Sequence, residues 1–154
     1  MENKEEQTSR LVLVVDDDEG VRRVLGRWVA DLGYGVCAAA DADSALDIMR
    51  KSPIDVALVD VRMPGHDGIW LVDQIGRLFP SIAVVLATGL MEMDPIVTLR
   101  PGVVGYIVKP FNRADLEAVI RRGLEERKRL QAERPSHSRL LPEAAIEGFV
   151  VSID

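Results

Sequence analysis

Five short apolar runs recur at nearly even spacing along the chain: Leu11–Val15, Val36–Ala40, Val56–Val59, Ile82–Ala87 and Val104–Val108. Runs that are apolar throughout and bounded by turn formers are typical of strands buried on both faces. Such strands belong to parallel sheets that are covered on both sides. We therefore expect a parallel sheet flanked by two layers of helices.

Between these runs, the apolar residues follow helical spacing. Residues 19–32 place their apolar side chains on one stripe, and Gly33 is suited to end that helix. Asp67 is suited to cap a later helix. The segment between Pro95 and Pro101 has the weakest helical pattern. The predicted helices span residues 19–32, 43–51, 67–79, 94–100 and 113 to about 133.

A strand and a helix alternating five times in about 120 residues predicts an α/β fold. The expected architecture is a flavodoxin-like (βα)5 doubly wound parallel sheet with strand order 2-1-3-4-5. In such sheets, ligands bind beyond the carboxyl ends of the strands. The functional residues are therefore expected directly after the strands.

Four predicted strands are followed by residues that suit phosphoryl chemistry. Asp16 and Asp17 follow the first strand, Asp60 the third, Thr88 the fourth and Lys109 the fifth. Mg²⁺ prefers carboxylate, water and phosphate oxygens, and an aspartate can accept a group covalently. A hydroxyl and an ammonium group can hold phosphate oxygens as charge develops. The set predicts Mg²⁺-dependent phosphoryl transfer.

The charges of this set also require a cation. Two carboxylates about 4 Å apart repel by roughly 4 kcal/mol at an effective dielectric constant near 20. Taken singly, each residue has a simpler explanation: Asp18 as a helix cap, Thr88 as a turn residue and Lys109 as a solvated charge. Their placement at the ends of different strands is what favours one shared site.

In these segments the chain resembles the receiver domain of two-component response regulators. The resemblance covers about residues 11–127. It rests on Val14-Val-Asp-Asp17, Leu58-Val-Asp-Val-Arg-Met-Pro-Gly65, Ala87-Thr88-Gly89 and Gly105-Tyr-Ile-Val-Lys-Pro-Phe111.

The resemblance implies that Asp60 accepts a phosphoryl group from a phosphohistidine. The donor would be a sensor histidine kinase or a histidine phosphotransfer protein. Asp17 would bind Mg²⁺ directly and Asp16 largely through water, with Asp60 and the backbone carbonyl of Arg62 as the remaining protein ligands. The domain would catalyse only its own phosphorylation and dephosphorylation.

The resemblance also assigns the readout of phosphorylation. Thr88 would hydrogen-bond the phosphate, and the Lys109 ammonium group would form an ion pair with it. The peptide bond between Lys109 and Pro110 would be cis. Tyr106 would be an aromatic switch. Signalling, and a homodimer, would use the face of the fourth helix, fifth strand and fifth helix. Gly89 and the short, proline-flanked fourth helix depart from the family pattern and put that surface in question.

Two other classes of function compete with this interpretation. A phosphatase of the haloacid-dehalogenase type also groups an aspartate, Mg²⁺, a threonine and a lysine at strand ends. Its nucleophile follows the first strand, whereas here the isolated Asp60 closes the third. A phosphorylation-independent docking module is the third class, and the complete set of acids, Thr88 and Lys109 argues against it.

Composition limits the partners and the compartment. The 154-residue chain has a formal net charge of −6 and a pI near 5.0, which disfavours direct nucleic-acid binding by this domain. No apolar run approaches the roughly 20 residues that span a membrane. One cysteine, Cys37, excludes an internal disulfide and fits a reducing compartment, so the cytoplasm is expected.

We predict three regions: a flexible leader at 1–10, a receiver domain at 11–128 and an extension at 129–154. Within the extension, Pro135–Ser138 is interpreted as a linker. Three alternatives are open for the apolar residues after it: they pack on the receiver or on a second copy of the chain, they begin an output domain, or they are disordered.

Overall fold

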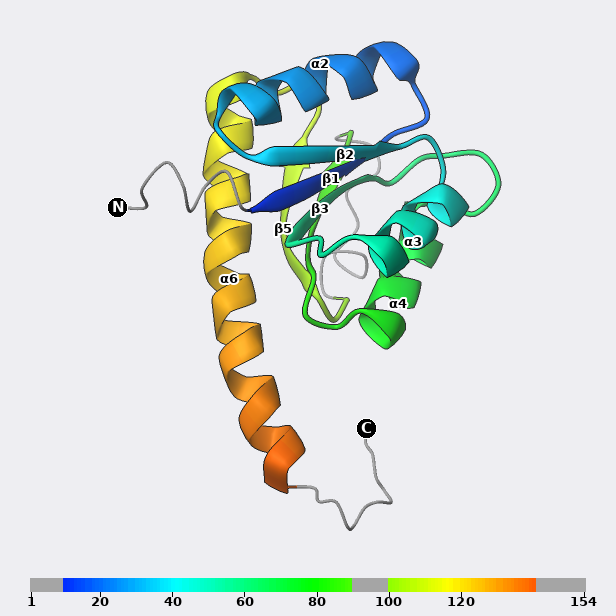
Figure 1. The fold of residues 1–154 in the computed structure, drawn as a ribbon. Coiled ribbons are helices and arrows are strands. Elements are labelled where there is room, and N and C mark those ends of the chain that lie inside the picture. The colour runs from blue at the N-terminus through cyan, green and yellow to red at the C-terminus, as the bar shows by residue number, and fades with distance from the viewer. Residues whose placement is uncertain (1–9, 90–99, 141–154) are drawn as a thin grey trace.

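The computed structural model describes residues 10–89 and 100–140. Its strands form one sheet in the order β2-β1-β3-β4-β5, and every neighbouring pair is parallel (Figure 1). The predicted fold class and strand order are therefore confirmed. The strands are β1 (Leu11–Val15), β2 (Gly35–Ala39), β3 (Val56–Asp60), β4 (Ala83–Thr88) and β5 (Val103–Val108).

Helices cover both faces of this sheet (Figure 1). Successive side chains of a strand point to opposite faces, so each strand contributes to two cores. Leu13 and Val59 pack with α3 and α4, whereas Val14 and Leu58 pack with α2 and α6. The described helices are α2 (Glu19–Asp31), α3 (Ala42–Lys51), α4 (Gly68–Leu78) and α6 (Arg113–Leu140).

Three helices begin at an aspartate cap. The side chains of Asp18, Asp41 and Asp67 accept hydrogen bonds from the backbone N–H groups of Val21, Ser44 and Trp70, at 3.1, 2.7 and 2.9 Å. These bonds satisfy N–H groups that the first helical turn leaves unpaired. The caps predicted at Asp18 and Asp67 are confirmed. Each one starts a helix close to the carboxyl edge of the sheet.

The last helix is longer than predicted. α6 extends to Leu140, so Pro135–Ser138 is helical, and the linker predicted there was wrong. Strong helix formers such as Arg, Glu, Leu and Ala dominate the preceding turns, and the helix continues through Pro135 although an interior proline loses one backbone donor and crowds the carbonyl of the turn before it. The predicted boundary between residues 128 and 129 lies inside this helix.

Some predictions concern residues outside the described ranges. These are most of the leader at 1–10, most of the fourth helix at 94–100, and the segment after residue 140. Within the described residues, no helix combines the length and apolar character needed to cross a membrane.

Candidate functional site

Three carboxylates meet at the carboxyl edge of the sheet. Asp16 directly follows β1, and Asp60 is the last residue of β3. These two residues are 3% and 7% exposed, whereas Asp17 is open to solvent. One ligand oxygen from each lies within 4.8 Å of the others. The predicted acidic site is therefore assembled as expected.

Lys109 brings a positive charge to the two buried acids. Its Nζ lies 3.1 Å from Asp60 Oδ1 and 3.3 Å from Asp16 Oδ2. The Lys109 backbone N–H donates to the carbonyl oxygen of Thr88, at 2.8 Å, which continues the pairing of β5 with β4. The peptide bond between Lys109 and Pro110 is cis, as the family resemblance implied.

Burial and neighbouring charges shift the pKa values of Asp60 and Lys109. Desolvation, and then repulsion from Asp16, raises the pKa of Asp60 against the opposing attraction of Lys109. Desolvation opposes the charge of Lys109, but the carboxylates of Asp60 and Asp16 outweigh it and raise the pKa of the lysine. One ammonium group thus pairs with two of the three acids, which leaves negative charge that a further cation could balance.

The acid set fits a hard divalent cation. All three donors are carboxylate oxygens, and the exposure of Asp17 leaves space for coordinated water. Asp17 and Arg62 also line a hollow of about 590 Å³ beside the acids. The backbone N–H of Arg62 donates to Asp60 Oδ1 at 3.4 Å, which is long for a hydrogen bond.

The two predicted switch residues differ in exposure. Thr88 ends β4 and is 4% exposed, and its hydroxyl donates to the carbonyl of Gly89 at 3.1 Å. Tyr106 lies on β5 with 45% of its surface exposed, so its ring is outside the pocket. Thr88 is at the predicted edge, but neither residue contacts the acids through a hydrogen bond among the described residues.

Sequence reasoning missed Gly68, which shapes the wall of the site. The Gly68 N–H donates to the Val61 carbonyl at 3.0 Å. A methyl group at Gly68 would overlap the backbone carbonyl oxygen of Asp60. Glycine therefore allows α4 to begin directly against the end of β3. The only signal in the sequence was a glycine at the first helical position, directly after the cap residue Asp67.

Comparisons with known proteins agree with this geometry. Residues 12–121 match the response regulator receiver domain family. The probable transcriptional regulator ycf27 of Cyanidium caldarium is 34% identical over 121 residues, 78% of this chain and 48% of that protein. The receiver domain of NtrX from Brucella abortus is 32% identical, with a TM-score of 0.70 over 74% of this chain and 98% of that chain.

A chemotaxis protein has the same fold at similar identity. CheY4 of Vibrio cholerae is 31% identical, with a TM-score of 0.70 over 75% of this chain and 98% of its own. The chain spans about half the length of ycf27. The family match covers more than two thirds of the chain and includes all three acids and Lys109. The chain belongs to the response regulator receiver domains.

Proposed function

We propose that this chain is a phosphorylation-activated switch in which Asp60 is the phosphoacceptor. The observation that carries the proposal is the position of Asp60. Its carboxylate ends a buried strand, 3.1 Å from the Lys109 ammonium and within 4.8 Å of the ligand oxygens of Asp16 and Asp17. Asp60, the last residue of the central strand β3, thus lies between Lys109 and the open hollow that Asp17 and Arg62 line.

Mg²⁺ fits the same residues. Asp17 would bind it directly, Asp16 largely through water, and Asp60 and the Arg62 carbonyl would complete the protein ligands. A bound divalent cation would neutralise charge on the phosphoryl oxygens during transfer. Burial, and then repulsion from Asp16, raises the pKa of Asp60, and a bound cation would oppose both effects by favouring the ionised carboxylate.

The proposed transfer forms one P–O bond and breaks one P–N bond. An oxygen of Asp60 attacks the phosphorus of a phosphohistidine, and the histidine nitrogen leaves with the electron pair of the broken bond. Lys109 Nζ would then hold a phosphoryl oxygen, and the Thr88 hydroxyl would donate to another. The donor protein would be a histidine kinase or a histidine phosphotransfer protein.

Phosphorylation would add about two negative charges to the pocket. Reorientation of Thr88 towards the phosphoryl group would free space for Tyr106, whose ring is now outside. The affected surface would be that of β5 and α6, together with the predicted fourth helix, most of which lies outside the described residues. The added charge would thereby shift this surface between two conformations. A partner protein or a second copy of the chain would bind one of them.

The test is phosphorylation by acetyl phosphate with Mg²⁺, followed by intact mass spectrometry. We expect one added phosphoryl group, which is lost when EDTA removes the metal and absent in Asp60→Asn. Asp67→Asn is the matched control, because asparagine preserves the helix cap while removing a carboxylate from the same hollow.

Two results would contradict the proposal. An unchanged mass of the wild-type chain would favour a docking module that is not phosphorylated. Repeated turnover of a generic phosphate monoester would favour a phosphatase.

A further inference from the structure

Asp16 is held at every polar group that it has. Its backbone N–H donates to Ala39 at 3.1 Å, and its Oδ1 accepts from the N–H of Asp18 at 3.0 Å. Its Oδ2 lies near Lys109 Nζ. The remaining group, the backbone carbonyl, accepts a hydrogen bond from the Arg22 guanidinium at 2.8 Å. Arg22 is thus the one side chain of α2 that donates to this residue among the described contacts.

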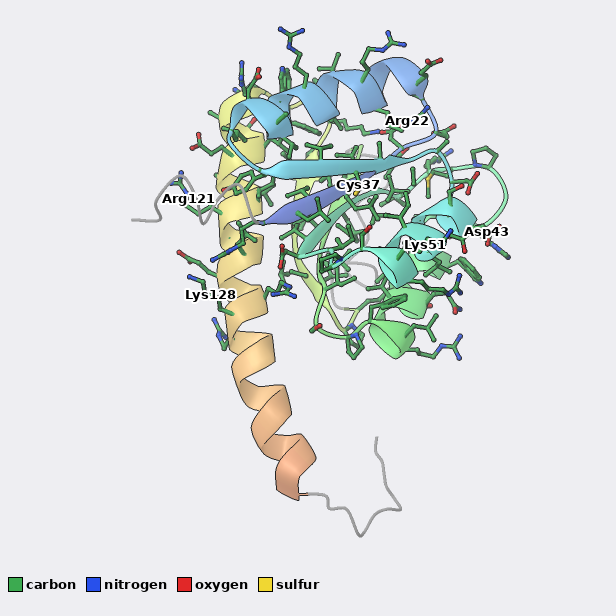
Figure 2. All side chains as sticks on the ribbon, viewed as in Figure 1. Arg22, Cys37, Asp43, Lys51, Arg121 and Lys128 are labelled. Atoms are coloured by element: carbon green, nitrogen blue, oxygen red, sulfur yellow. The ribbon has the colours of Figure 1, made fainter. Side chains whose placement is uncertain are left out.

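The Arg22 contact fixes more than Asp16 itself. The carbonyl of Asp16 belongs to the peptide unit that joins it to Asp17. Because this unit is planar, holding its oxygen also fixes the direction in which the Asp17 Cα leaves it. Figure 2 shows Arg22 at the N-terminal end of α2, beside the loop from β1.

Asp17 depends on this backbone support. Its side chain is solvent-exposed and accepts no hydrogen bond from the described residues. The residue after it, Asp18, is fixed by its own cap bond to Val21. Arg22 on one side and this cap on the other therefore restrain the backbone of Asp17 and the direction of its Cα–Cβ bond, from which the carboxylate reaches the site.

We propose that Arg22 is a positioning residue for the metal-binding pair Asp16 and Asp17. This inference rests on the proposed function, since it takes Mg²⁺ as the ligand of these acids. Arg22 touches neither the cation nor the phosphoryl group; it acts through the peptide bond between the two ligands. Partners that orient metal ligands in this way commonly change metal affinity 10- to 100-fold when they are lost.

The direction of the change in Mg²⁺ affinity distinguishes a positioning role of Arg22 from a purely electrostatic one. Arg22 is a cation near a cation site, so deleting its charge should tighten Mg²⁺ binding if only Coulomb forces act. Losing its hold on the peptide should weaken binding. Arg23 is the matched control, because it carries the same charge one residue later but, in the part of the chain that the structure describes, pairs with exposed Glu19 at 3.0 Å.

The experiment is a Mg²⁺ titration of the ¹⁵N-labelled full chain, followed by amide chemical shifts. We expect Arg22→Gln to raise the Kd for Mg²⁺ by on the order of 10-fold. Arg23→Gln should leave the Kd unchanged or slightly lower. Arg22→Lys should recover part of the affinity, because an ammonium group can donate to the same carbonyl without the planar fork of arginine.

Equal or tighter Mg²⁺ binding by Arg22→Gln, relative to Arg23→Gln, would overturn the inference. Failure of the wild-type chain to bind Mg²⁺ would instead overturn the proposed function. Thermal unfolding without Mg²⁺ reports whether each variant folds. If Arg22→Gln does not fold, the Mg²⁺ affinities of the charge-conserving variants Arg22→Lys and Arg23→Lys are compared instead. Equal Kd values for Mg²⁺ in these two variants would contradict a positioning role for Arg22.

Discussion

At the scale of single residues, ionisation of the buried Asp60 is expected to lower the stability of the metal-free protein. Asp60 and Asp16 are nearly inaccessible to solvent and share one ammonium group from Lys109. The pKa of Asp60 is raised, first by desolvation and then by Asp16. Because the folded chain holds the Asp60 proton more tightly than the unfolded chain, ionisation of this residue favours unfolding.

Asp60→Asn should therefore stabilise the metal-free protein at neutral pH. The substitution removes the free-energy cost of ionising Asp60 in the folded chain. This cost is absent below the pKa of Asp60 in the unfolded chain, about 4, and grows as the pH rises through the higher pKa of the folded chain. We expect the melting temperature to rise by a few degrees at pH 7 and the gain to vanish near pH 3.

The control for this prediction is Asp67→Asn, which keeps a helix cap and should show no such pH-dependent gain. Thermal unfolding followed by circular dichroism, with EDTA present, measures both variants. A gain for Asp60→Asn that persists unchanged at low pH would assign the effect to packing rather than to ionisation.

At the scale of elements, the start of α4 depends on a single glycine. Gly68 lies where any side chain would collide with the Asp60 carbonyl and the Val61 Cα. Both collisions involve backbone atoms, which cannot rotate away as a flexible side chain can. The helix and the end of β3 must separate if this residue gains a methyl group.

Gly68→Ala should destabilise the fold by about 2 kcal/mol, within the range of overpacking substitutions, and slow phosphorylation of Asp60. Gly76→Ala in the same helix is the matched control, because its nearest contact is the Pro101 carbonyl at an ordinary 3.7 Å. Alanine there should be neutral or stabilising by up to about 1 kcal/mol. Urea unfolding and the phosphorylation rate test the pair, and equal stability of the two variants would contradict the clash.

The elements that sequence predicted well are those with local signals. Apolar runs marked the strands, and Asp18 and Asp67 marked helix starts, because burial pattern and capping act over a few residues. The acids, Thr88 and Lys109 were placed correctly because parallel strands all end at one edge. Contacts to backbone atoms, such as Arg22 with the Asp16 carbonyl, have no residue-type signature and were not predictable.

At the scale of the whole molecule, an ion pair joins α6 to the amino-terminal end of β3, at the other end of the strands from the acidic site. Arg127 lies 3.1 Å from Asp55 Oδ1, and their side chains are 17% and 13% exposed. The second oxygen of Asp55 accepts from the Leu11 N–H at 2.7 Å. Asp55 thus links β1, β3 and α6, which are far apart in the chain.

Replacing Asp55 should lower the free energy of unfolding by more than replacing an exposed acid does. Asp55→Ala leaves the Arg127 charge and the Leu11 N–H without this partner, and we expect a loss of about 3 kcal/mol. Asp47→Ala, whose pair with Arg50 is more than half exposed on both sides, should change stability by less than about 1 kcal/mol. Urea unfolding decides, and similar losses in both variants would refute the distinction.

The same ion pair lies where α6 begins to extend beyond the sheet (Figure 1). Figure 1 shows α6 continuing past the sheet. From Arg127 to Leu140 this projecting part is about 20 Å long, so a tilt of about 10° at its base would sweep its tip through about 3 Å. A small tilt of α6 beside Asp55 would therefore be carried to the far end of the helix, away from the sheet.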